Sequence, residues 1–166
     1  SSSAASDVYK RQYYDSADET FDIEWLKKDD GLILHYTSGS TGQPKGVLHV
    51  QQAMVQHYIT GKYVLDLKED DVYWCTADPG WVTGTSYGIF APWLNRVTNV
   101  VFGGRFSPEA WYETLEKYDV TVWYSAPTAF RMLMSAGDEL VHQYDLSSLR
   151  HILSVGLSLI HISEPT

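Results

Sequence analysis

The sequence predicts an α/β fold in which alternating βα units form a mainly parallel sheet with helices on both faces. From residue 31 onward, short apolar runs of strand length alternate with stretches whose apolar residues recur at helical spacing. Turn-forming residues such as Asp78-Pro79-Gly80 and Gly103-Gly104 follow these apolar runs, as expected where strands end.

The strands of this sheet are expected at five apolar runs rich in β-branched and aromatic residues. They are residues 32–36, 72–75, 98–102, 120–124 and 151–155. The carboxyl ends of parallel strands share one edge, where ligands gather in such folds. We therefore expect the loops after all five strands to lie at that edge.

The first two helices are expected between the early strands. Residues 50–65 place Met54, Tyr58 and Leu65 on one helical face, with Val55 and Ile59 beside it. Residues 86–94 are apolar on most sides, which is typical of a buried helix.

Two later helices carry start and stop signals. Ser107 is a good N-cap, and Pro108 suits the first helical position of a helix that continues to about Tyr118. Another helix begins at residues 126–128 and continues to about residue 136, where Gly137 ends it.

Composition limits the class of protein. The 166 residues carry 12 Lys and Arg against 21 Asp and Glu, a net charge of −9, which argues against nucleic-acid or membrane-surface partners. Cys75 is the single cysteine, so no intrachain disulfide can form and a cytoplasmic location is expected. No apolar run approaches membrane-spanning length.

Both ends of the sequence differ from its middle. Residues 1–12 lack apolar periodicity, and residues 157–166 follow an interrupted motif; both resemble translated adapter sequence. We expect residues 1–12 and 157–166 to be non-native and residues 13–156 to be part of one domain.

Residues 36–47, called here the phosphate-loop segment, have the composition of a polyphosphate-binding loop. Glycines let the backbone N–H groups approach an anion, hydroxyls add donors, and a lysine adds positive charge. The candidate residues are Thr37, Ser38, Gly39, Ser40, Thr41, Gly42 and Lys45. The spacing G-x-x-x-x-G-K-S/T of nucleotide hydrolases is not met.

The segment instead resembles the phosphate-loop signature of the adenylate-forming superfamily, with every specified position matched from Tyr36 to Gly46. A second stretch, Trp74 to Tyr87, is similar to the segment T-A-D-x-G-W-V-T-G-x-S-Y of the acetyl-CoA synthetase family. Residues 125–129 and 149–156 also look like that family. The resemblance implies that residues 13–156 are part of the large N-terminal domain of an adenylate-forming enzyme.

The resemblance implies a two-step reaction. A short carboxylate, acetate, attacks the α-phosphate of ATP·Mg²⁺ to give acetyl-adenylate and pyrophosphate, and CoA then takes the acetyl group. Lys45 and Thr41 would stabilise the charge that develops on the phosphates, and Thr41 could approach Mg²⁺.

The resemblance also implies roles for residues outside the phosphate-loop segment. Trp81, Val82 and Thr83 would line the acyl pocket, with Thr83 near the approach of the CoA thiol, and Val155 would form a second wall. Gly156 would contact the nucleotide, although Leu157 stands where the family has glutamate.

Several interpretations remain open. Asp78 could orient the pocket loop or only cap its turn. The histidines show no metal-ligand spacing, so no metal site is expected. Another acyl- or aryl-adenylating enzyme, or a non-catalytic nucleotide-binding module, would also use such a loop. The family's catalytic C-terminal domain is not recognisable here, so we expect the chain alone to be inactive.

Overall fold

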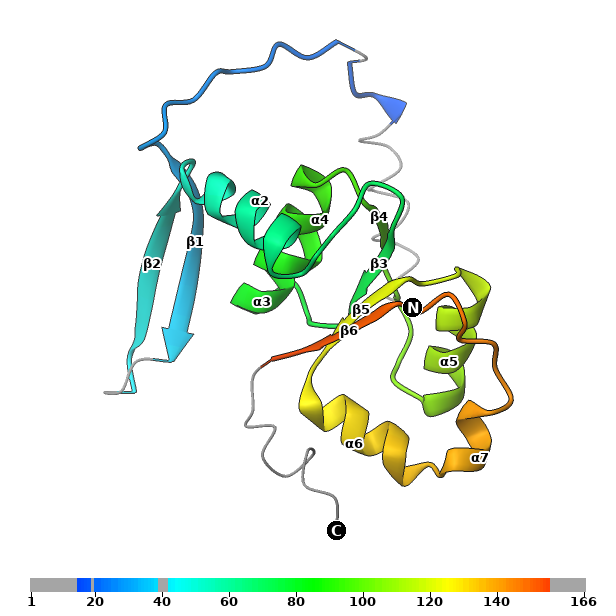
Figure 1. Ribbon diagram of the computed structural model, residues 1–166. Coiled ribbons are helices and arrows are strands. Elements are labelled where there is room, and N and C mark those ends of the chain that lie inside the picture. Colours follow the sequence, from blue (N-terminus) through cyan, green and yellow to red (C-terminus); the bar gives the residue numbers. More distant parts are fainter. Residues whose placement is uncertain (1–14, 19, 39–41, 156–166) are drawn as a thin grey trace.

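A computed structural model describes residues 15–155 except residue 19 and residues 39–41 (Figure 1). The expected non-native ends, residues 1–12 and 157–166, lie outside the described residues. So do four predicted site residues, which are Gly39, Ser40, Thr41 and Gly156.

The predicted parallel sheet is confirmed. It has four strands in the order β4-β3-β5-β6, and every neighbouring pair is parallel. The strands are β3 (Val72–Cys75), β4 (Thr98–Val100), β5 (Val122–Ser125) and β6 (His151–Ser154).

Alternation along the strands divides the core between the two faces of this sheet. Trp74 and Trp123 belong to one hydrophobic cluster, whereas Tyr73, Val122 and Tyr124 belong to the other. Successive side chains of a strand point to opposite faces, so each strand contributes to both clusters.

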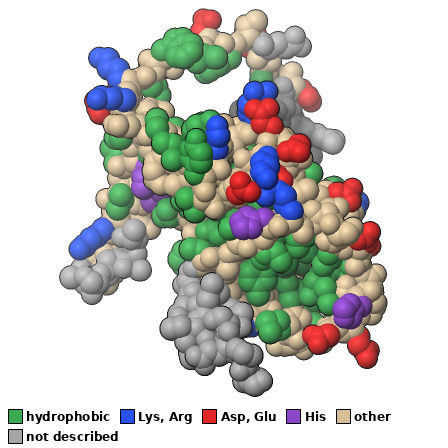
Figure 2. All heavy atoms as spheres, in the orientation of Figure 1, with side chains coloured by type: hydrophobic (Ala, Val, Ile, Leu, Met, Phe, Trp, Pro, Cys, Tyr) green, Lys and Arg blue, Asp and Glu red, His purple; other side chains and the backbone are tan. Residues whose placement is uncertain are grey.

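The Trp74 face is covered by α5 (Pro108–Lys117), α6 (Pro127–Ser135) and the short α7 (Asp138–Val141), which was not predicted (Figure 1). Hydrophobic side chains remain visible between β6 and α6 in the space-filling view (Figure 2).

The expected signals begin and end these helices. The Ser107 side chain accepts a hydrogen bond from the Ala110 amide at 3.1 Å and caps α5. After α6, Gly137 has φ +92°, which an L side chain rarely adopts. Both helices were predicted because their boundaries depend on local residues.

The opposite face carries α2 (Ala53–Tyr63) and a continuous helical stretch from residue 82 to residue 94. That stretch consists of α3 (Val82–Thr85), the π-helical turn η1 (Ser86–Phe90) and α4 (Ala91–Leu94). The expected helix at residues 86–94 therefore exists. It begins earlier than predicted and contains a wide turn, in which the Ala91 amide donates to the Ser86 carbonyl.

The predicted face of the first helix is confirmed only in part, because Leu65 is buried and Met54 is half-buried. His57 and Gly61 are its buried residues, whereas Val55, Tyr58 and Ile59 are exposed. A Cβ at Gly61 would lie 3.2 Å from the Ala91 Cβ, so α2 packs close against α4. Small side chains permit that approach, and Val55, Tyr58 and Ile59 face outward.

The first expected strand does not join the parallel sheet. β1 (Gly31–Ser38) pairs antiparallel with β2 (Pro44–Val50), and the two form a separate hairpin (Figure 1). The prediction failed because the polar, glycine-containing start of β2 reads as loop. Antiparallel pairing lets a short turn join the strands.

A buried ion pair joins the amino-terminal ends of the parallel strands. Asp71 is 4% exposed, and its carboxylate accepts hydrogen bonds from Arg150 Nε at 2.8 Å, the Thr121 hydroxyl at 2.7 Å and the Lys68 amide at 2.8 Å. Arg150 also donates to the Asp66 carboxylate at 2.8 Å. These contacts lie at the opposite end of the sheet from its carboxyl edge.

None of the helices in the described part of the chain has the length and apolar character required to cross a membrane.

Candidate functional site

Polar groups meet where the central strands β3 and β5 end. The Thr76 and Ser125 hydroxyls lie 2.5 Å apart, and the Thr76 amide donates to the Tyr124 carbonyl at 3.0 Å. The carboxyl edge of the sheet therefore begins with a hydrogen-bonded connection between its two middle strands.

The loop after β3 is held as a compact turn. Asp78 Oδ1 accepts from the Gly80 amide at 2.7 Å, and the Asp78 carbonyl accepts from the Trp81 amide at 2.9 Å. A Cβ on Gly84 would lie 2.0 Å from that carbonyl oxygen, so glycine is required there. Asp78 thus caps this turn, which fixes where Trp81 starts α3.

The predicted acyl-pocket residues lie at this edge but do not enclose a pocket within the described residues. Trp81 is 74% exposed, Val82 is exposed and Thr83 is half-buried. Val155 directly follows β6 and is also exposed. The fold therefore brings both predicted pocket walls to one edge of the parallel sheet.

The described residues of the phosphate-loop segment, 36–38 and 42–47, belong to the hairpin and not to the parallel sheet, which corrects the expectation that β1 ends in the same sheet as the other four strands. Thr37 and Ser38 end β1, and Thr37 pairs with Lys45 in the register of β2. Gly42 has φ +79°, consistent with a glycine-dependent turn. Lys45 is exposed and forms no ion pair within the described residues.

A cleft of about 440 Å³ lies beside the ends of β3 and β4. Its lining includes Asp78, Pro79 and Gly84 on one side, and Phe102 and Trp111 on the other. The sequence did not predict it, because its walls come from segments that are distant along the chain.

Two titratable groups near the edge, Cys75 and Tyr124, have pKa values raised by burial. Burial raises the pKa of the Cys75 thiol, so the thiol stays protonated at neutral pH. Burial, with smaller contributions from Cys75 and Tyr87, raises the pKa of Tyr124 to about 12. In the described part of the chain, no three His, Cys, Asp or Glu side chains are grouped so that they could hold a metal ion.

Sequence reasoning missed two contacts at or near this edge. Thr76 pairs with Ser125, and the His35 ring of β1 lies 3.2 Å from the Thr85 hydroxyl. The only sequence signal for the first pair is that each residue is the polar residue at the end of an apolar strand. Nothing in the local sequence indicates the second pair, whose members are 50 residues apart.

Known proteins match this chain closely. The acetyl-coenzyme A synthetase of Bacillus subtilis is 76% identical over 135 residues, which are 81% of this chain and 24% of that protein. The acetyl-coenzyme A synthetase of Deinococcus radiodurans is 43% identical over 154 residues, which are 90% of this chain and 24% of that protein. The chain thus spans about a quarter of the length of these curated relatives.

A solved structure has the same fold. The crystal structure of a Brucella canis acyl-CoA synthetase aligns with a TM-score of 0.83 at 31% identity, over 89% of this chain and 27% of that one. The alignment includes most of the described residues, so the parallel sheet and its helices match part of a larger enzyme.

The sequence also matches the AMP-binding enzyme family over residues 2–160. This match covers nearly the whole chain, and it agrees with the phosphate-loop segment and with the parallel sheet. The chain belongs to the AMP-binding enzyme family.

Proposed function

We propose that this chain is a segment of an AMP-forming acetate–CoA ligase. The whole protein activates acetate with ATP, giving acetyl-adenylate and pyrophosphate, and then transfers the acetyl group to CoA. The observation that carries the proposal is the fixed turn that places Trp81, Val82 and Thr83 at the carboxyl edge. Support also comes from the 76% identity to the Bacillus subtilis acetyl-coenzyme A synthetase.

Lys45 and the phosphate-loop segment bind the triphosphate of ATP in this proposal. Lys45 fits an anionic ligand because it is exposed and has no ion-pair partner among the described residues. Adenylation develops negative charge on the α-phosphate and the leaving pyrophosphate, which a lysine and backbone N–H donors stabilise. The other residues proposed to bind the triphosphate are the hydroxyl-bearing Thr37, Ser38, Ser40 and Thr41 and the glycines Gly39 and Gly42.

Mg²⁺ enters as part of the substrate ATP·Mg²⁺. Its preferred ligands are oxygens, which the phosphates and one hydroxyl can supply without a dedicated group of carboxylates. Thr41 is the candidate for that hydroxyl. Gly156 is the candidate for a contact with the nucleotide after β6.

The proposed acyl pocket accepts only a short acid because bulky side chains form its walls. These walls are Trp81, Val82, Thr83 and Val155. A carboxylate is ionised at neutral pH, so it can attack the α-phosphate without a general base. The raised pKa values of Cys75 and Tyr124 are compatible with this chemistry, which needs neither group as a base. Thr83 lies next to the approach of the CoA thiol in the proposal.

We expect this chain to be inactive alone, because its relatives are about four times as long. The single cysteine supports a cytoplasmic location. Residues 13–156 remain our proposal for the domain segment.

A full-length chimera tests the function. Residues 15–155 of this chain replace the matching segment of the Bacillus subtilis enzyme, and acetate-dependent exchange of pyrophosphate into ATP is measured. We expect exchange with acetate and little with benzoate. The unmodified Bacillus enzyme is the control for folding and assay conditions.

Two outcomes would contradict the proposal. Exchange with benzoate but not acetate would indicate another acyl- or aryl-adenylating enzyme. ATP binding without any acid-dependent exchange would indicate a nucleotide-binding module.

A further inference from the structure

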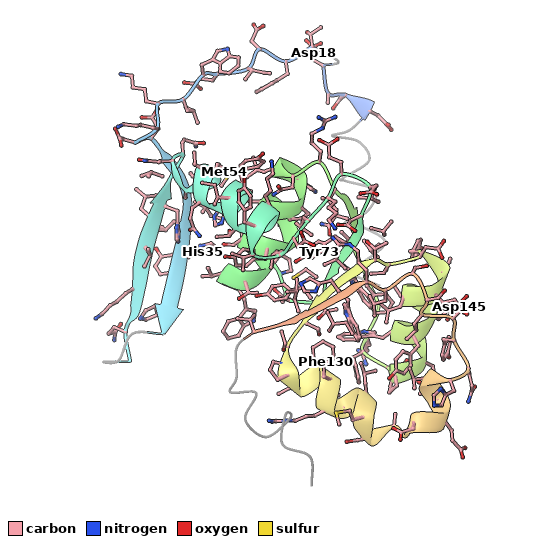
Figure 3. All side chains as sticks on the ribbon, in the orientation of Figure 1. Asp18, His35, Met54, Tyr73, Phe130 and Asp145 are labelled. Carbon is pink, nitrogen blue, oxygen red and sulfur yellow. The ribbon has the colours of Figure 1, made fainter. Side chains whose placement is uncertain are left out.

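The two faces of the hairpin differ. Leu34 and Tyr36 of β1 are exposed, whereas Ile33 and His35, which alternate with them, are half-buried. His35 lies on the side of β1 that faces α2 and α3 (Figure 3). The His35 side chain therefore extends from β1, the strand that leads into the phosphate-loop segment, toward α3, the helix that follows Trp81.

The Thr85 hydroxyl of α3 is the polar partner of His35. His35 Nε2 lies 3.2 Å from Thr85 Oγ1, and Thr85 Oγ1 lies 2.7 Å from the Pro79 carbonyl oxygen. A hydroxyl has one proton, and the carbonyl can only accept it. The Thr85 hydroxyl therefore donates to Pro79 and accepts from the Nε2–H of His35.

This arrangement connects His35 to the turn that carries the proposed acyl-pocket wall. Besides its bond to Pro79, the Thr85 hydroxyl lies 3.3 Å from the Trp81 carbonyl oxygen, and the Thr85 amide donates to that carbonyl at 3.0 Å. Thr85 thus binds both ends of the Pro79–Trp81 stretch. A shift of Thr85 would move Trp81.

The His35–Thr85 bond is the sole hydrogen bond between the hairpin strands and residues 53–155 within the described part of the chain. The other nitrogen of His35, Nδ1, is buried and has no partner there. The ring also contacts His49 of β2 edge-on, with centroids 5.2 Å apart. Packing against His49 and one hydrogen bond therefore hold the ring in place.

We propose that His35 is a positioning residue that fixes the distance between the phosphate-loop segment and the Trp81–Thr83 wall of the acyl pocket. This inference rests on the proposed function. Attack requires the carboxylate and the α-phosphate to lie about 3–3.5 Å apart, and a misplacement of 1 Å can cost about 100-fold in rate. The two substrates are held by segments that meet through the His35–Thr85 bond.

The test uses the full-length chimera with His35→Leu, Thr85→Val and the double substitution. We expect each single variant to lower kcat/KM for acetate-dependent exchange by about fivefold, because one hydrogen bond is worth about 1 kcal/mol. The KM for acetate rises, and the affinity for ATP measured by equilibrium dialysis is unchanged. The double variant is expected to lose no more activity than the less active of the two single variants, because both changes remove the same bond.

Two conservative variants serve as matched controls. His35→Gln keeps an N–H donor and Thr85→Ser keeps the hydroxyl, so both are expected to retain most of the activity. Losses that multiply in the double variant would overturn the inference while leaving the proposed function intact. So would an unchanged KM for acetate in His35→Leu.

A readout independent of activity separates the two proposals. Hydrogen–deuterium exchange of the amides of residues 79–85 is expected to become faster in His35→Leu, although residue 35 lies on a different element. Unchanged exchange there would overturn the inference even if the chimera showed no activity with acetate. Absence of acetate-dependent activity in the unsubstituted chimera would overturn the proposed function alone.

Discussion

The parallel sheet and the β1–β2 hairpin hold their residues in different ways. Trp74 in the sheet is 1% exposed and lies in a hydrophobic cluster that includes Trp111 and Trp123. In the hairpin, Tyr36 is 69% exposed and Lys45 is exposed as well. The sheet is stabilised by burial on both faces, whereas the hairpin keeps its shape mainly through the pairing of its two strands. Burial is therefore concentrated in the parallel sheet, whereas the proposed phosphate site is formed by exposed residues of the hairpin.

The largest expected effect concerns the sheet. Asp71→Ala removes a buried carboxylate that accepts hydrogen bonds from Arg150, Thr121 and the Lys68 amide, and should destabilise the sheet by about 3–5 kcal/mol. Amide hydrogen exchange of β5 in the chimera measures this local stability. Asp66→Ala is the matched control, since it removes an exposed partner of the same guanidinium and should have a much smaller effect.

The same carboxylate predicts a pH dependence. Burial raises the pKa of Asp71, but hydrogen bonds from Arg150, Thr121 and the Lys68 amide outweigh burial and lower it below its ordinary value. The stabilisation is present above the unfolded pKa, about 4, and is lost as the pH falls through the folded pKa. Protection of β5 should therefore decline below about pH 4, and an equal decline in Asp71→Ala would contradict this explanation.

The next effect concerns the hairpin, where a substitution is expected to slow the reaction without changing the stability of the sheet. Lys45→Ala should slow acetate-dependent ATP–pyrophosphate exchange by about 100- to 1000-fold, because a charge that stabilises the transition state is removed. Amide protection of β5 should not change. Lys62→Ala makes the same charge change on the exposed surface of α2 and should leave exchange unaffected. An unchanged rate in Lys45→Ala would remove Lys45 from the proposed site.

A third substitution acts where the sheet supports the proposed acyl pocket. Gly84→Ala would place a Cβ 2.0 Å from the Asp78 carbonyl oxygen, so the turn must open. We expect exchange with acetate to fall by about 100-fold through displacement of Trp81. Gly88→Ala is the control, since its Cβ would meet the Cys75 sulfur at 3.6 Å, an ordinary contact. Equal activity of the two variants would show that the turn does not position the pocket.

The smallest effect concerns the packing of α2 on α4. Gly61→Ala would place a Cβ 2.4 Å from Asn95 Nδ2, which donates to the Tyr58 and Ala91 carbonyls. The cost of displacing Asn95 outweighs the better helix propensity of alanine. The free energy of local unfolding of α2, measured by amide hydrogen exchange, is therefore expected to fall by about 1 kcal/mol. In an Asn95→Ala background the same Gly61→Ala change should become neutral or stabilising, and a further loss there would contradict the proposed clash.

Local signals account for the parts of the fold that could be predicted. Ser107 and Pro108 begin α5, Gly137 follows α6, and the β-branched and aromatic runs locate β3 and β5, because each of these choices depends on neighbouring residues. The partner of β1 could not be predicted in this way. β2 begins in a polar, proline- and glycine-containing stretch, and its pairing depends on the turn that precedes it.

The candidate site also contains residues that the sequence indicated and contacts that it could not indicate. The family resemblance implied that Trp81, Val82 and Thr83 line a pocket for a short acid, and the composition around Lys45 indicated a phosphate site; those roles stay predictions. The contact between His35 and Thr85 and the cleft beside β4 arise from tertiary packing and have no periodic or local signature. The buried face of α2 was missed for a related reason, because Gly61 permits a close approach that hydrophobicity does not indicate.

The π-helical turn Ser86–Phe90 gives the segment between Trp81 and Leu94 one residue more than a regular α-helix would need. An α-helix advances about 100° per residue, so this extra residue sets the angular phase of α4 relative to α3. Deleting one residue from the turn would rotate α4, with its packing against Gly61, by about that angle relative to Trp81. The length of this segment, as much as its composition, is therefore a constraint on any variant of the proposed acyl-pocket wall.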